Sequence, residues 1–228
     1  MKKIASVELL RFISAIMVVI WHYQLFYSPY NIFLNTEILA SNRDQQPFYN
    51  FLSLFYNYGN RGVDFFFIIS GFVFGYVYLV ENKTVKFNFF FINRFARLYP
   101  LHLITLIVVS ILQFYSYEKF NSNLIHFYND TYHFFLHLFF ISGWGFEKGP
   151  SFNGPIWSVS LEIIIYFLFF FLIINFKKKR ISKSILLVVI FITLKKMFSD
   201  SSLQIINMKI INCGMLFFEG VLVYYFFN

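Results

Sequence analysis

The chain has 228 residues, of which 58% are hydrophobic and only 13% are charged. This composition excludes an ordinary soluble domain and predicts an all-α fold, a polytopic bundle of transmembrane helices. The apolar runs are continuous and do not alternate, which argues against an outer-membrane β-barrel. The net charge of +8 comes from short basic clusters between apolar runs, which is typical of topology signals and does not indicate nucleic-acid binding.

Six apolar stretches are candidate membrane spans. We expect them at residues 7–26, 62–80, 98–117, 156–176, 185–198 and 205–227. The fifth is the weakest, because Lys195 and Lys196 would have to extend toward the bilayer surface. Residues 134–141 are too short to cross the bilayer, and we expect them to lie in the interface or to re-enter.

Basic residues predict the orientation of these spans. Lys2 and Lys3 precede the first span, and residues 177–180 form the strongest cytoplasmic signal in the chain. The connector at residues 81–97 is also basic, so it is expected on the same side. Pro100 would then fall in the first turn of the third span, where proline is tolerated.

Metal and disulfide chemistry have little support. Cys213 is the one cysteine in the sequence, which excludes an internal disulfide framework. His133 and His137 have a spacing that can hold a metal, with His126 nearby, but we find no carboxylate or cysteine at a recognisable distance. We therefore predict an interfacial amphipathic surface there, and no metal site.

Arg11 and His22 bracket the apolar run of the first span. An ionisable residue inside a membrane helix is costly and by default marks a functional site that faces the protein interior. Their spacing places both on one helical face, about 16 Å apart. They cannot touch, but they can line two depths of one cavity.

Three further polar residues should lie near the depth of His22, in the outer half of the bilayer. Glu162 is a candidate because an ionised carboxylate within a membrane span is costly and by default marks a functional site. It could instead satisfy a buried polar neighbour. Asp64 is a second candidate or a simple helix cap. Ser70 is a conceivable acyl acceptor, but helix packing explains it better.

A basic layer is expected on the opposite side. Arg94 and Arg97 are three residues apart, hence on one helical face, and suit bidentate phosphate recognition. Both could instead be topology determinants, which is the better interpretation of Lys83 and Lys86. His102 falls at a similar level.

Four segments together resemble the acyltransferase 3 family, the membrane acyltransferases that O-acylate cell-surface polysaccharides. They are the R-x10-H helix from Arg11 to His22, residues 62–72, the R-x-x-R-x-x-P segment at 90–100 and the W-S-x-S-x-E helix at 153–166. The resemblance covers about residues 5–170. Because the family usually has about ten helices, we expect the chain to form the N-terminal part of one such domain over residues 1–228.

The resemblance implies an enzyme of the inner (plasma) membrane with a cytoplasmic N-terminus. It would move an acyl group, in particular acetyl, from cytoplasmic acyl-CoA to a hydroxyl of an envelope or exported carbohydrate. His22 would be the catalytic histidine and Arg11 its companion, with Arg94 and Arg97 holding the donor. Trp157 and Ser158, in the fourth motif, would support the substrate or the site. No tightly bound cofactor and no metal is expected.

The predicted layers fit this chemistry. The basic layer suits the phosphates of CoA, and His22 could remove the proton of the acceptor hydroxyl as a general base. Glu162 or Asp64 could orient the imidazole and stabilise its charged form, as in hydrolytic triads. The alternative is a non-catalytic membrane component, such as a glycan or lipid carrier, or an inactive remnant. The acceptor sugar and the oligomeric state leave no trace in the sequence.

Overall fold

A computed structural model describes residues 5–27, 43–79, 85–123, 125–174, 179–199 and 208–227. Every regular element in these ranges is helical, which confirms the predicted fold class. Five helices are long and apolar enough to cross a membrane: Ala5–Tyr27, Arg61–Tyr78, Phe87–Phe120, Ile156–Ile174 and Met208–Phe227. The chain divides into two compact units, residues 1–69 and 70–228. The predicted topology signals Lys2, Lys3 and Lys83 lie outside the described residues.

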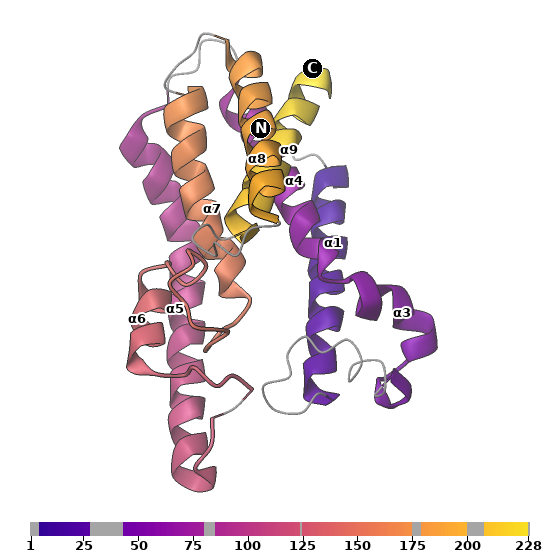
Figure 1. Ribbon diagram of the computed structural model, residues 1–228, viewed down its shortest axis with the longest axis vertical. Coiled ribbons are helices and arrows are strands. Elements are labelled where there is room, and N and C mark those ends of the chain that lie inside the picture. The colour runs from indigo at the N-terminus through magenta and orange to yellow at the C-terminus, as the bar shows by residue number, and fades with distance from the viewer. Residues whose placement is uncertain are drawn as a thin grey trace. The chain divides into compact units, whose positions relative to one another are not determined.

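The first unit is built on α1 (Ala5–Tyr23) and its extension η1 (Gln24–Tyr27). It also contains η2 (Arg43–Gln45), α3 (Tyr49–Tyr58) and the start of α4 (Arg61–Tyr78), and α3 packs against α1 (Figure 1). Two glycines allow this close approach. A Cβ atom at Gly59 would lie 2.2 Å from the carbonyl oxygen of Met17, and one at Gly62 would lie 2.6 Å from that of Ser14. One face of α1 is therefore held against the chain that follows α3.

The second unit contains the rest of α4 and the helices after it. These are α5 (Phe87–Phe120), α6 (Thr131–Leu138), α7 (Ile156–Leu168), the π-helical turn η3 (Phe169–Ile174), α8 (Arg180–Ser199) and α9 (Met208–Phe227). Its core is aromatic and centres on Phe74 of α4. The ring of Phe74 contacts rings from α5, α7, η3 and α9, namely Phe90, Tyr166, Phe169 and Phe217. These interlocking rings hold four segments of the chain to one centre.

Helix α5 corrects the prediction for the third span. The sequence suggested a cytoplasmic connector up to residue 97 and Pro100 in a first turn, but the helix begins at Phe87 and encloses Pro100. The run of phenylalanines before Arg94 is helical because its rings pack on α7 and η3. Phe91, for example, stacks on Phe167 with ring centroids 4.3 Å apart.

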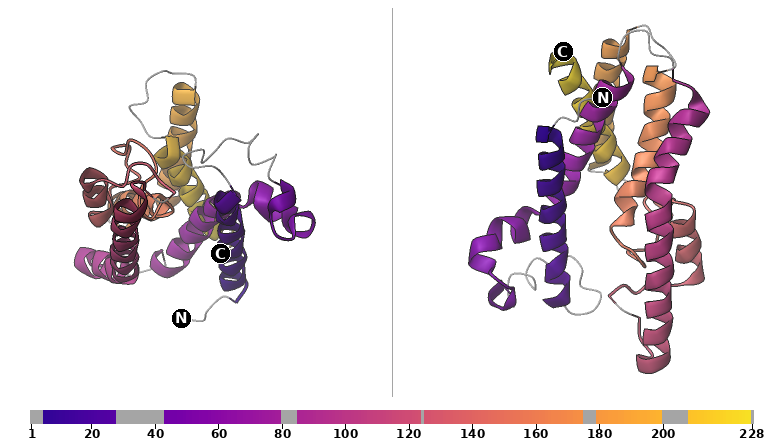
Figure 2. Two further views of the ribbon diagram at one scale, coloured as in Figure 1. Left: turned by 90° about the horizontal axis from the view of Figure 1, so that it is seen from below. Right: turned by 180° about the vertical axis from the view of Figure 1, so that it is seen from behind.

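The part of α5 beside α7 and η3 is its N-terminal half. The Phe91–Phe167 contact lies near one end of this pairing, and a hydrogen bond of 3.1 Å from the Asn153 side chain to the Thr105 hydroxyl lies near the other. A helix of 34 residues is about 51 Å long, well beyond the roughly 30 Å of a bilayer core. The C-terminal half therefore extends past the start of α7, and α6 lies along α5 (Figures 1 and 2).

The fifth predicted span, residues 185–198, falls within α8, which is not among the five helices suited to crossing a membrane. Every 18-residue stretch of this helix contains Lys183, Lys195 and Lys196. Helix α8 instead packs along α9 (Figures 1 and 2). At its start, Arg180 donates a hydrogen bond of 3.1 Å from Nε to the carbonyl of Ile173, so this predicted topology residue also caps the end of η3.

The contact between α4 and α9 gives a test of this packing. A Cβ atom at Gly71 would lie 1.8 Å from the carbonyl oxygen of Phe217, so neither helix can accept a side chain there. We expect Gly71→Val to destabilise the protein by about 1–3 kcal/mol or more, measured by thermal unfolding in detergent. Ala96→Val, on an exposed position of α5, is the matched control and should change stability by less than about 0.5 kcal/mol. Equal melting temperatures for the two variants would contradict this packing.

Candidate active site

His22 has a defined ring orientation within the first unit. It is half-buried near the end of α1, and its Nδ1 lies 2.7 Å from the carbonyl oxygen of Val18. A carbonyl can only accept, so Nδ1 carries the proton and donates it. Nε2 is therefore the proton acceptor of the neutral ring. Trp21 packs edge-on against the imidazole, with centroids 4.8 Å apart.

This geometry corrects the predicted triad. In a hydrolytic triad a carboxylate accepts the hydrogen bond from Nδ1. Here the backbone of the preceding helical turn occupies that position, so neither Glu162 nor Asp64 is needed to orient the ring of His22. The ring is oriented by the helix itself.

Arg11 lies on the same side of α1 as His22, as the spacing predicted. Both side chains are half-buried, whereas Phe12, Ile13 and Val19 are exposed. Arg11 forms an ion pair of 3.6 Å with Glu8, and the carboxylate of Glu8 is itself largely exposed. An exposed pair of this kind contributes little to stability, which leaves Arg11 available to an anionic ligand.

Asp64 behaves as a helix-start residue. It lies in the first turn of α4 and pairs with Arg61, with 3.2 Å between Nη1 and Oδ2. A carboxylate there is stabilised by the helix dipole and by its arginine neighbour. The structure therefore favours the capping interpretation that the sequence left open.

Arg94 lies in the aromatic core of the second unit. Its guanidinium carbon is 4.4 Å from the ring centroid of Phe74, and Nη2 donates a hydrogen bond of 2.9 Å to the hydroxyl of Tyr78. Its Nε is buried, with no hydrogen-bond partner among the described residues. Arg97, one helical turn further along α5, is exposed. The two arginines that the sequence grouped together therefore have different surroundings.

Glu162 and Ser70 meet at Tyr166, a residue to which the sequence analysis gave no role. The hydroxyl of Tyr166 donates to Oε2 of Glu162, and the side chain of Ser70 also hydrogen-bonds to this tyrosine. Tyr166 is buried, and its ring lies 6.0 Å from the guanidinium carbon of Arg94. The signal that could have identified it is its position four residues after Glu162, which places both on one face of α7.

These contacts contradict the predicted separation of Arg94 from Glu162 in two layers. Tyr166 contacts both of them. The prediction was wrong because it placed Arg94 before the start of a span. In fact α5 begins earlier, and the half-buried Arg94 lies beside Tyr166, near the C-terminal end of α7.

The two serines of the W-S-x-S-x-E segment, Ser158 and Ser160, have different contacts. Ser158, predicted as a support residue, donates a hydrogen bond of 3.0 Å to the carbonyl of Pro155 at the start of α7. Ser160 is fully buried and accepts a hydrogen bond of 2.8 Å from the backbone N–H of Gly143. The ammonium of Lys209 lies 5.0 Å from the ring centroid of Trp157, a cation–π contact. Ser160 is thus the serine that fastens the preceding loop to α7.

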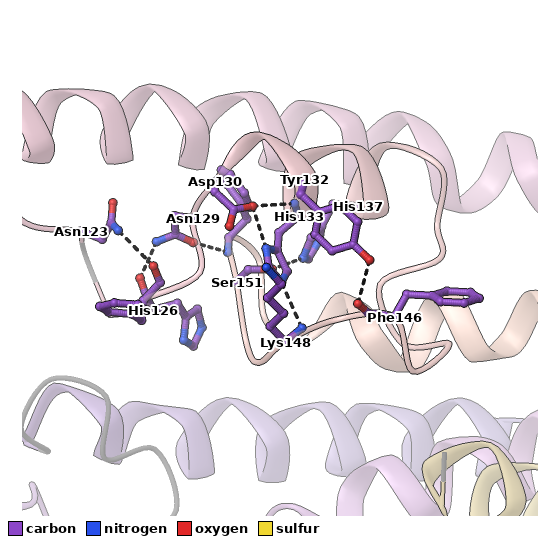
Figure 3. A network of polar contacts seen from close by, with 12 residues as sticks. Asn123, His126, Asn129, Asp130, Tyr132, His133, His137, Phe146, Lys148 and Ser151 are labelled. Carbon is purple, nitrogen blue, oxygen red and sulfur yellow. Dashed lines mark hydrogen bonds and ion pairs between the residues drawn. The ribbon is translucent and has the colours of Figure 1, made fainter. Parts of the chain in front are cut away.

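The histidines of residues 125–152 form a hydrogen-bonded network (Figure 3). Asp130 caps α6 and accepts from both the backbone N–H and Nδ1 of His133, at 2.9 and 2.7 Å. Nε2 of His133 accepts from the backbone N–H of Lys148 at 3.1 Å. Burial opposes the charge of Asp130, but the bonds from His133 outweigh burial and lower the pKa of this carboxyl group. The expected amphipathic surface is wrong, because His133 and His137 are both buried.

This network shows no catalytic or metal-binding arrangement. Nε2 of His137 lies 3.1 Å from the hydroxyl of Ser151, the distance of a serine–histidine pair. However, Nδ1 of His137 is buried and has no hydrogen-bond partner in the described part of the chain, so no third group orients the ring. No three His, Cys, Asp or Glu residues of the described ranges are grouped to hold a metal. The network therefore holds the loop to α5, where Nε2 of His102 bonds to the carbonyl of His137 at 2.8 Å.

Burial of His137 makes the stability of residues 125–152 depend on pH. Desolvation, reinforced by the neighbouring histidines His102, His133 and His126, lowers the pKa of His137 from 6.5 to about 4. Between these values the unfolded chain binds the proton and the folded chain does not, so stability falls as pH drops from 6.5 to about 4. The loss should reach about 3 kcal/mol.

Hydrogen exchange of residues 125–152 between pH 7 and pH 4 measures this loss. The control is His137→Gln, whose amide cannot titrate, and which should reduce the pH dependence in this window. An unchanged pH dependence in the variant would exclude His137 as its cause.

Neither a search of curated proteins nor a search of solved structures finds a match. The family model of the acyltransferase domain called acyltransferase 3 matches residues 4–228. The match covers nearly the whole sequence and agrees with the four motifs and the helical architecture. The chain belongs to the acyltransferase 3 family and is a membrane acyltransferase.

Proposed function

We propose that the chain transfers an acetyl group from cytoplasmic acetyl-CoA to a hydroxyl of an envelope or exported carbohydrate. The family supplies acyl transfer in a membrane setting. The choice of donor rests on the basic residues Arg11 and Arg97, which suit the phosphates of CoA. The choice of acceptor rests on the polysaccharide-acylating relatives that the four motifs resemble.

The tautomer of His22 is the observation that carries this proposal. A general base that deprotonates a hydroxyl at neutral pH needs an unprotonated ring nitrogen held in a fixed direction. The hydrogen bond from Nδ1 to the carbonyl of Val18 provides both, since it fixes the ring and leaves Nε2 as the acceptor.

The proposed reaction is a direct transfer. Nε2 of His22 takes the proton of the acceptor hydroxyl while that oxygen attacks the thioester carbonyl. The new C–O bond forms, the C–S bond of acetyl-CoA breaks, and the imidazolium returns the proton to the departing thiolate of CoA. No acyl-enzyme is needed, and Ser70, bonded to Tyr166 and buried, is better explained as a packing residue.

Two site residues keep roles in this scheme beyond His22. Glu162, which accepts a hydrogen bond from Tyr166, would stabilise positive charge that develops in the chemical step. Arg11 would guide the anionic donor on the face of α1 that also carries His22. We propose a cytoplasmic N-terminus in the inner membrane, in line with the basic cluster at residues 177–180.

His22→Ala tests the proposal. Loss of the base should reduce acetylation at least 100-fold, within the range of about 10²–10⁴ that general-base catalysis contributes. The measurement is transfer of radiolabelled acetyl from acetyl-CoA into the carbohydrate fraction of membranes that contain the full chain, normalised to the amount of inserted protein.

Val19→Ala is the control, because Val19 lies on α1 with an exposed side chain. It should keep acetylation within twofold of the unmodified protein. If His22→Ala also keeps activity within twofold, His22 is not the base. If the unmodified chain transfers no acetyl group, the non-catalytic alternative is favoured.

A further inference from the structure

The guanidinium of Arg94 is occupied by protein partners. It lies 4.4, 5.5 and 6.0 Å from the ring centroids of Phe74, Tyr78 and Tyr166, and it donates a hydrogen bond to the hydroxyl of Tyr78. A cation over aromatic faces is attracted by their electron density, most strongly where water is excluded. Of its in-plane donors, Nη2 is bonded to Tyr78 and Nε is buried, so Arg94 offers a phosphate fewer donors than an exposed arginine does.

Arg97 offers the contrast on the same helix. Its side chain is exposed, so an anionic ligand can approach its guanidinium without displacing protein partners. A planar guanidinium binds phosphate through two parallel hydrogen bonds, provided that its donors are accessible. Arg97 meets that condition fully, whereas Arg94 is half-buried and already bonded to Tyr78.

Tyr166 connects the Arg94 site to the carboxylate of Glu162. Its ring stacks on Phe74 with centroids 4.6 Å apart, and Phe74 is the ring that Arg94 approaches most closely. Its hydroxyl donates to Oε2 of Glu162. Any movement of the Phe74–Tyr166 stack therefore changes the direction of this hydrogen bond, and with it the orientation of the carboxylate.

We propose that Arg94 is a positioning residue for Glu162, acting through Phe74 and Tyr166, and that Arg97 alone of this pair contacts the phosphates of the donor. This assignment rests on the proposed acyl transfer from acetyl-CoA. It separates the two arginines of the R-x-x-R segment, which would otherwise share one role. Arg94 then affects the chemical step, and Arg97 affects donor binding.

Steady-state kinetics of the full chain with acetyl-CoA distinguish these roles. Arg97→Gln should raise the KM for acetyl-CoA at least tenfold with kcat within threefold. Arg94→Gln should lower kcat at least tenfold with KM within threefold. Arg94→Lys retains the charge but not the planar group, and should recover only part of the lost kcat.

A double-mutant cycle tests the route through Tyr166. Tyr166→Phe removes the hydrogen bond to Glu162 and keeps the stacked ring, so it should lower kcat about as much as Arg94→Gln. If Arg94 acts through Tyr166, the double variant should lose little more than either single variant. Multiplied losses would overturn this route, and a purely structural role of Arg94 predicts lower yield with unchanged kcat per folded molecule.

Binding of coenzyme A, measured by titration calorimetry on the purified chain, gives a readout that does not need turnover. Arg97→Gln should weaken binding at least tenfold and Arg94→Gln less than threefold. Equal weakening by the two substitutions would overturn the division of roles while leaving acetyl transfer intact. If the unmodified chain neither binds coenzyme A nor transfers acetyl, the proposed function fails and this assignment fails with it.

Discussion

A positive charge inside an apolar helix bundle needs compensating partners, and the second unit is arranged around such a charge at Arg94. Aromatic rings from α4 and α7 surround the guanidinium, and Tyr78 accepts one of its hydrogen bonds. Because a desolvated cation without such partners is costly, these rings cannot be exchanged freely for aliphatic side chains. Stabilising this cation is one physical reason for aromatic residues in the core of a chain that is 24% aromatic.

The same core brings separate parts of the family's motifs into contact. Ser70 comes from the second motif and Phe74 follows it by two residues, Arg94 comes from the third, and Tyr166 and Glu162 come from the fourth. Residues that lie far apart in the sequence thus form one group of contacting side chains. His22, in the first unit, depends instead on its own helix, whose backbone fixes its tautomer. The orientation of His22 is therefore set by local structure, and that of Tyr166, which donates to Glu162, by tertiary packing.

The histidine network of residues 125–152 shows how polar chemistry can serve structure. Its imidazoles are buried and bonded to a helix cap, to backbone groups and to a serine, and Nδ1 of His137 has no hydrogen-bond partner among the described residues. Neutral imidazole suits this role because one ring nitrogen donates and the other accepts, so one side chain joins two segments. The cost is a loop whose stability depends on pH.

The sequence by itself determined the fold class, four of the membrane-suited helices nearly to their ends, the family and the shared face of Arg11 and His22. Continuous apolar runs and helical periodicity are local properties, so they can be recognised in the sequence without knowledge of the packing. Only the tertiary structure decided the start of α5, the different surroundings of Arg94 and Arg97 and the contacts of Tyr166. Each of these depends on which side chains meet across helices. The phenylalanines before Arg94 resembled part of a connector until their partners on α7 were known. The earlier helix start places Arg94 within α5, beside the rings of Phe74 and Tyr166.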